Sequence, residues 1–136
     1  LQRLPPAEIS VLAGSLQHYK HLKVLRLLDF ESTDATAADF DKAVATNNTV
    51  EKLHLKAGSR KSAVAMVKAL AEALKMNSSV TTINLDNYLD NKAIGPEGAQ
   101  AFAETLKVNF SVTTIDLKRN EIGPEGAQAL AEAMKA

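Results

Sequence analysis

The chain has 136 residues, of which 16 are basic and 16 acidic, so its formal net charge is zero. A balanced charge gives no reason to expect a nucleic acid or an anionic membrane as partner, and no apolar run approaches the roughly 20 residues of a membrane span. The absence of cysteine excludes a disulfide framework and a thiolate nucleophile and fits a reducing compartment, so we expect one cytoplasmic domain.

The first element in chain order is a helix. Leu12 and Leu16 are four residues apart, which is the spacing of one helical face. Pro6 fits the first turn of this helix, where a missing N–H costs nothing. Aligning Pro6 with Pro96 leaves no strand before this helix. We therefore expect residues 1–21 to be a partial repeat and the chain to be part of a longer array.

Four segments then follow one pattern: an apolar residue, two variable residues, an apolar residue, one variable residue and a last apolar residue. They begin at residues 22, 50, 80 and 112, so the spacings are 28, 30 and 32 residues. Such a period predicts a repeat array, here with repeats 22–49, 50–79, 80–111 and 112–136. We expect each segment to be a strand with these residues in the core: Leu25, Leu27, Leu53, Leu55, Ile83, Leu85, Ile115 and Leu117.

A helix is expected after each strand. Apolar residues recur four positions apart before the next strand begins, and Pro96 and Pro124 fit first helical turns. Asn47, Asn77 and Asn109 lie three residues before the next strand, where a turn with left-handed backbone favours asparagine. The helix core pairs are Phe40 and Val44, Leu70 and Leu74, Phe102 and Leu106, and Leu130 and Met134.

The same three asparagines begin Asn-x-Ser/Thr sequons, which alone would suggest a glycosylated, secreted protein. Their recurrence at one point of the repeat favours a structural role in the turn. Asp41 departs from the repeat, because the equivalent positions hold alanine. We expect its carboxylate at the rim of the helix face or paired with a lysine.

The strand pattern followed by residues 94–106, Ile-Gly-Pro-Glu-Gly-Ala-Gln-Ala-Phe-Ala-Glu-Thr-Leu, resembles the leucine-rich repeat of the ribonuclease-inhibitor type, and residues 122–134 nearly repeat it. That class includes Ran GTPase-activating proteins and sensor domains of innate immune receptors. The resemblance implies one α/β solenoid domain over residues 1–136, curved, with parallel strands on the concave side and helices on the convex side. The stretch from residues 47–53 through residues 75–77 also resembles the repeat domain of tropomodulins, the actin pointed-end caps.

Alternation of side chains along a strand places the variable positions on the concave face, in three columns. A surface of mixed charge suits a protein partner, whereas a solvated ladder of weak ion pairs is the structural alternative. The columns are Val24, Lys52, Thr82 and Thr114; Arg26, His54, Asn84 and Asp116; and Leu28, Lys56, Asp86 and Lys118. The expected contact residues are Arg26, Leu28, Lys52, His54, Lys56, Asn84, Asp86, Asp116 and Lys118.

The third repeat carries an insertion after its strand. Eight residues, 86–93, stand where the next repeat has four, 118–121. Insertions in repeat arrays lie in loops, often on the binding side. Tyr88 and Leu89 are therefore a second candidate contact, and neutral variation of a solvent loop is the alternative.

The sequence contains no catalytic constellation. His18 and His21 have a spacing that could hold a metal, but no third ligand is evident, and there is no P-loop or dinucleotide motif. In residues 95–98 and 123–126, proline removes an N–H and glutamate adds negative charge, which argues against a phosphate cradle. We expect no enzyme activity, cofactor, metal or small-molecule substrate.

These observations predict a non-catalytic module that binds a protein through its concave face. One alternative is an actin-filament cap or cytoskeletal adaptor of the tropomodulin kind. Another is a GTPase-activating protein, for which Arg119, in the loop after the last strand, could supply the catalytic arginine. A purely structural segment of a large assembly is a third.

Overall fold

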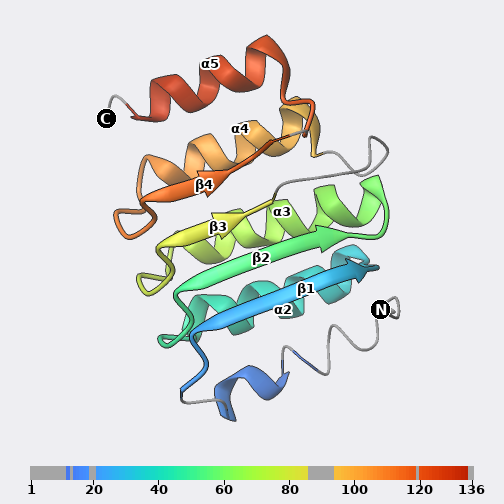
Figure 1. The fold of residues 1–136 in the computed structure, drawn as a ribbon, viewed down its shortest axis with the longest axis vertical. Helices are drawn as coiled ribbons and strands as arrows, with labels where there is room; N and C mark the ends of the chain where they lie inside the picture. The colour runs from blue at the N-terminus through green and yellow to red at the C-terminus, as the bar shows by residue number, and fades with distance from the viewer. Residues whose placement is uncertain (1–11, 13, 19–20, 86–93, 119, 135–136) are drawn as a thin grey trace.

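The computed structural model describes residues 12, 14–18, 21–85, 94–118 and 120–134. Each of the four described strands is followed by one helix (Figure 1). The elements are η1 (Leu16–His18), β1 (Val24–Phe30), α2 (Asp34–Thr46), β2 (Lys52–Ala57), α3 (Arg60–Leu74), β3 (Thr82–Asn84), α4 (Gly95–Leu106), β4 (Thr114–Asp116) and α5 (Gly123–Met134).

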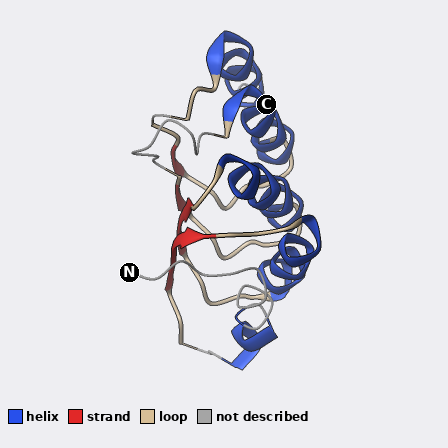
Figure 2. Cartoon of the chain, turned by 90° about the vertical axis from the view of Figure 1, so that its right-hand side faces the viewer, coloured by secondary structure: helices blue, strands red, loops and turns tan. Residues whose placement is uncertain are grey.

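The strands form one parallel sheet in the order β1-β2-β3-β4. Because consecutive strands are neighbours and parallel, each connection must cross back over the sheet, and the helices make these crossings. Figure 2 shows the result as two layers, strands on one side and helices on the other. The predicted alternation of parallel strands and covering helices is confirmed. The repeat boundaries and the longer array stay predictions.

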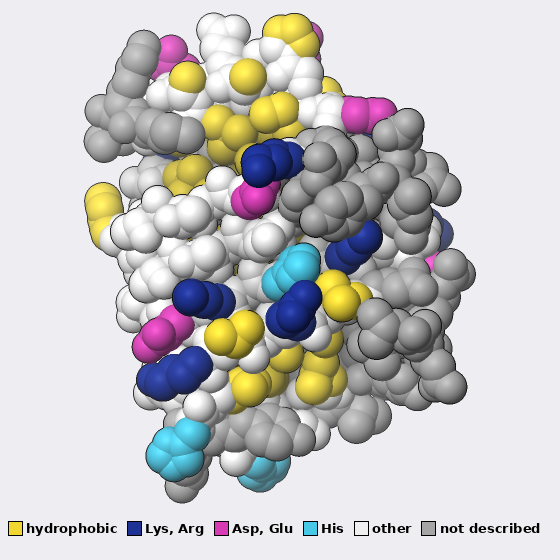
Figure 3. Space-filling model, viewed as in Figure 1, with side chains coloured by type: hydrophobic (Ala, Val, Ile, Leu, Met, Phe, Trp, Pro, Cys, Tyr) yellow, Lys and Arg dark blue, Asp and Glu magenta, His cyan; other side chains and the backbone are white. Residues whose placement is uncertain are grey.

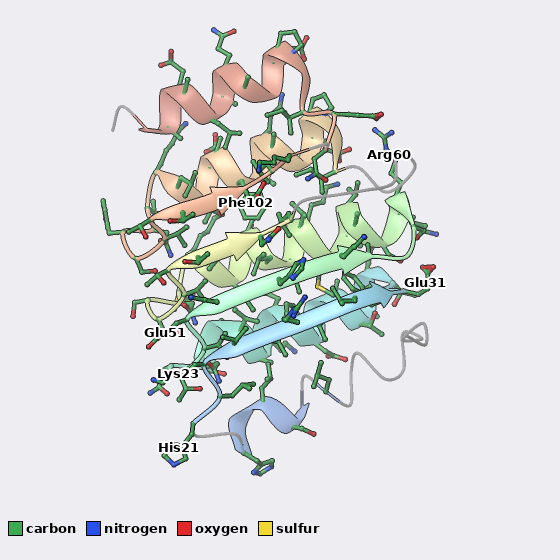
Figure 4. The ribbon with its side chains drawn as sticks, in the orientation of Figure 1. His21, Lys23, Glu31, Glu51, Arg60 and Phe102 are labelled. Carbon is green, nitrogen blue, oxygen red and sulfur yellow. The ribbon has the colours of Figure 1, made fainter. Side chains whose placement is uncertain are left out.

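The core lies between the two layers. Leu53, Leu55 and Ile83 point from the sheet toward the helices and are buried, as predicted. Phe102 fills the space between sheet and helix from the α4 side (Figure 4). The predicted helix residues buried there are Phe40, Val44, Leu70, Leu74, Phe102 and Leu130, with Leu106 half-buried.

One core prediction is only partly right. Ile115 and Leu117 are half-buried, whereas the equivalent Ile83 and Leu85 are buried. The reason is position in the sheet: β4 is an edge strand with a described strand on one side only. A core that depends on stacked neighbours is thinner at its edge.

The helices begin in two different ways. Thr33 and Ser59 cap α2 and α3 through side-chain oxygens that accept backbone N–H groups, and Thr36 completes a capping box at α2. By contrast, α4 and α5 begin at Gly95 and Gly123, both with φ of +68°. That left-handed backbone suits glycine.

The prediction of left-handed asparagines is wrong for Asn47, which has φ −74° and ψ 137°. In the described part of the chain, Glu121 is the one residue other than glycine with positive φ. The asparagines are there for their side chains instead. The Oδ1 atom of Asn109 accepts the N–H groups of Ser111 and Val112, both at 2.9 Å.

The same amide reaches back into the preceding repeat. Nδ2 of Asn109 donates to the carbonyls of Leu74 at 2.7 Å and Asn77 at 3.0 Å. Asn77 does the same toward Val44 and Asn47, both at 2.8 Å. Two buried amides with both hydrogens donated support the structural reading of the sequons.

Candidate functional site

The outward side chains of β1, β2, β3 and β4 form a surface that we call the strand face. Strand pairing confirms two of the three predicted columns and the start of the third, because each pair is parallel and in register there. Val24, Lys52, Thr82 and Thr114 lie side by side; so do Arg26, His54, Asn84 and Asp116; and Leu28 lies beside Lys56.

Two parts of the predicted contact surface cannot be placed in the same way. Asp86, Tyr88 and Leu89 lie outside the described residues. Lys118 is described and exposed, but β4 ends before it at Asp116. The predicted ladder of Lys56, Asp86 and Lys118 therefore stays a prediction.

The strand face combines charge with accessible aliphatic surface. Arg26, Lys52 and Lys118 are exposed, whereas Leu28, His54, Lys56, Asn84 and Asp116 are half-buried. Val24 is 47% exposed at the start of β1. Figure 3 shows basic side chains gathered over β1 and β2, with apolar side chains among them. The surface can offer hydrogen bonds, charge and aliphatic contact together.

Asp116 has a local role as well. Its Oδ1 accepts the backbone N–H of Lys118 at 3.1 Å, which fixes the turn after β4. At the other end of the sheet, Lys23 and Glu51 form an exposed ion pair of 3.4 Å beside the starts of β1 and β2 (Figure 4). Exposed pairs of this kind contribute little to stability. A partner can therefore separate the two charges at small cost and bind either of them.

A hydrogen-bond cluster beyond the end of β1 was not predicted. The Glu31 carboxylate accepts the hydroxyl groups of Ser59 at 3.0 Å and Ser62 at 2.7 Å (Figure 4). The Ser62 hydroxyl oxygen also accepts the N–H of Ser32 at 2.8 Å. The cluster ties the first repeat to the start of α3. The sequence did offer one local signal, because Ser59 precedes Ser62 by three residues, the spacing of a helix cap and its partner.

Asn120 is a second residue with a defined set of hydrogen bonds that was not predicted from the sequence. It is buried, and its Nδ2 donates to the carbonyl of Leu85 at 2.6 Å. Its Oδ1 accepts the N–H of Ile94 at 3.3 Å. The side chain therefore ties Leu85 and Ile94, the residues on either side of the third repeat's insertion, to the loop after β4, a structural role.

The helix layer carries its own ion pair between repeats. Lys68 of α3 bonds to Glu97 of α4, and this hydrogen bond holds the pKa of Glu97 below its ordinary value and the pKa of Lys68 above its own. Glu97 also lies in the first turn of α4, where a negative charge is favourable. Both side chains are exposed and lie in the layer opposite the strand face.

Among the residues that the structure describes, no cluster of three or more His, Cys, Asp or Glu side chains could hold a metal. His18 and His21 are exposed. Arg119, the candidate catalytic arginine, lies outside the described residues. Among the described helices, none is long and apolar enough to cross a bilayer.

Comparison with known proteins places the fold. The model of the Leucine Rich repeat family matches residues 108–131. A solved structure described as leiomodin-1 actin-binding site 2 is 22% identical with a TM-score of 0.70, covering 94% of this chain and 71% of that one. The C-terminal domain of tropomodulin from Caenorhabditis elegans is 12% identical with a TM-score of 0.50, covering 94% and 92%. No curated protein sequence matches the chain.

Proposed function

We propose that this chain, a leucine-rich repeat protein with a tropomodulin-like fold, is a non-catalytic cytoplasmic module that binds another protein through its strand face. The observation that carries the proposal is the register of the sheet. It lines up variable side chains from four successive strands on the side that the helices leave open (Figure 2).

The chemistry of the face supports a protein partner. Aliphatic groups such as Val24 and Leu28 supply surface whose burial favours association. The surrounding Arg26, Lys52 and Lys118 provide charges that select the partner and speed encounter. Strand pairing fixes the backbone that carries these groups before binding, so ordering the backbone adds little to the entropy cost.

The test compares capture of protein partners from extract by the native chain and by two triple variants. The strand-face variant is Arg26→Ala, Lys52→Ala and Lys118→Ala, three exposed residues. The matched control is Lys42→Ala, Lys61→Ala and Lys68→Ala, which removes the same charge from the helix layer. We expect a partner that the control retains and the strand-face variant loses. Equal capture by both variants would place the binding surface elsewhere.

A second candidate is binding to actin filaments. It is favoured by the fold likeness to leiomodin-1 actin-binding site 2 over 94% of this chain. Cosedimentation with filamentous actin and elongation rates at the pointed end test it directly. If the native chain binds actin filaments and the strand-face variant does not, actin is the protein that the strand face binds. A native chain that stays in the supernatant at saturating actin would eliminate actin filaments as the partner.

A further inference from the structure

Two successive turns of the repeat expose large apolar side chains at the edge where helices end and strands begin. Met76 is 76% exposed, Val108 is 53% exposed and Phe110 is 88% exposed. They line an open groove of about 460 Å³ that we call the turn groove, formed by Leu74, Lys75, Met76, Asn77, Ser78, Val108, Asn109, Phe110 and Ser111. Single exposed apolar residues are ordinary, but three lining one groove indicate an interaction surface.

The fold itself does not require these side chains. Asn77 and Asn109 make the hydrogen bonds that shape the two turns. In the alignment that these asparagines define, Phe110 occupies the position of Ser78 and of Asn48 in earlier repeats. Two of the three turns therefore carry a polar residue at this position, so the turn does not require a phenyl ring.

Two ion pairs lie beside the groove in the part of the chain that the structure describes. Lys75 lies 3.1 Å from Glu72, and Lys107 lies 3.2 Å from Glu104, with all four side chains at least 40% exposed. Two positive and two negative groups favour neither an acidic nor a basic partner. They do complement a second copy of themselves, because a two-fold axis can bring each lysine opposite a glutamate of the other copy.

We propose that the turn groove docks a second copy of this chain, in a dimer in which Phe110 of each copy enters the groove of the other. Such an interface is isologous, since the same patch supplies both the protruding ring and the hollow that receives it. Three apolar side chains and their charged rim on each copy bury on the order of 1,000 Å² in total, the low end of specific interfaces. The dimer is accordingly weak and reversible.

Sedimentation velocity across roughly 10 µM to 1 mM tests the proposal, a range that covers weak complexes. The native chain is expected to shift from 14.6 kDa toward twice that mass as concentration rises. Phe110→Ser is expected to stay monomeric throughout. The matched control is Val24→Ser, which removes an exposed apolar residue from the strand face and should associate like the native chain. Thermal melts establish that both variants fold.

A charge exchange tests the pairing itself. Lys75→Glu with Lys107→Glu makes the rim wholly acidic, and Glu72→Lys with Glu104→Lys makes it wholly basic. Each variant alone should lose self-association through like-charge repulsion, and an equimolar mixture should regain it. A native chain that stays monomeric at the highest concentration, or a Phe110→Ser variant that dimerises like the native chain, would overturn the proposal, as would an unrelated protein occupying the groove of a monomer.

Discussion

Asn109 joins three parts of the chain through one small side chain. Its carbonyl oxygen organises the turn that leads into β4, and its amide hydrogens bond to Leu74 and Asn77 in the preceding repeat. The residue is 7% exposed, so water cannot readily replace these partners. Buried groups that lose their hydrogen bonds carry the full cost of having left water.

Asn109→Ala is therefore expected to lower the free energy of unfolding by about 2–4 kcal/mol. Asn47→Ala is the matched comparison. Asn47 organises its turn in the same way, but its Nδ2 has one described contact, 3.4 Å from Thr49. It should cost about half as much, and chemical denaturation of both variants measures the difference. Equal losses would mean that the bonds between repeats contribute nothing.

Asp41 is placed where other repeats hold alanine, and it lies half-buried at the rim of the helix face. Burial, with the nearby Glu72 adding to it, raises the pKa of Asp41 above its ordinary value, while Lys42 opposes the shift. The folded protein thus holds this proton more tightly than the unfolded chain does. Ionised Asp41 consequently lowers stability at pH values above its folded pKa.

Asp41→Asn is expected to raise stability at pH 7 by about 0.5 kcal/mol, a small value because the site is partly solvated. Asparagine has nearly the same helix propensity, so the comparison isolates the charge. The gain should vanish near pH 3, about one unit below the ordinary pKa of aspartate, because the native carboxyl is then protonated as well. A gain that is independent of pH would contradict an electrostatic origin.

At the scale of elements, close approach of α4 and α5 depends on glycine. A Cβ atom added at Gly126 would lie 2.9 Å from Cβ of Ala99 and 3.2 Å from Cβ of Ile122. Both distances are shorter than ordinary carbon contacts of about 3.5–4.0 Å. The two helices can stack at their present separation only while residue 126 has no side chain.

Gly126→Ala is expected to destabilise the chain by about 1–2 kcal/mol, because overpacking outweighs the better helix propensity of alanine. Gly14→Ala serves as the control, since an added Cβ there meets nothing within 4 Å. The control should keep or slightly raise the melting temperature. If Gly126→Ala does the same, α5 can move away from α4 at no cost.

The strands and the turns of this fold are predictable from the sequence to different degrees. The strand pattern alone placed Leu53, Leu55 and Ile83 in the core, because alternation along a strand is strict. The roles of Asn77 and Asn109 were recognised only as turn residues. Their bonds to the preceding repeat depend on which carbonyls the stacking brings within reach, and no local pattern in the chain encodes that.

At the scale of the whole molecule, the strand columns were predictable for the same reason as the core. A repeat of fixed pattern sets the register, so Arg26, His54, Asn84 and Asp116 had to align. Neither the bonds of Glu31 to Ser59 and Ser62 nor the turn groove could be predicted. Both arise from side chains about 30 residues apart that become neighbours only when repeats stack.

Stacking also makes stability depend on position along the array. Each repeat packs mainly against its neighbours, so the free energy is close to a sum of local terms. Leu55 of β2 lies between described strands on both sides and is 4% exposed. Leu117 holds the same place in the pattern, but it follows the edge strand β4 and is half-buried.

Leu55→Ala is expected to cost about 2–5 kcal/mol, whereas Leu117→Ala should cost about 1–2 kcal/mol, because the edge site leaves a smaller cavity. Denaturant unfolding measures both values, and hydrogen exchange shows where they act. Exchange at β4 should quicken in Leu117→Ala while β2 stays protected, since local terms permit the edge to open alone. If both variants instead lower protection equally across all strands, the array unfolds as one unit and the sum of local terms does not describe it.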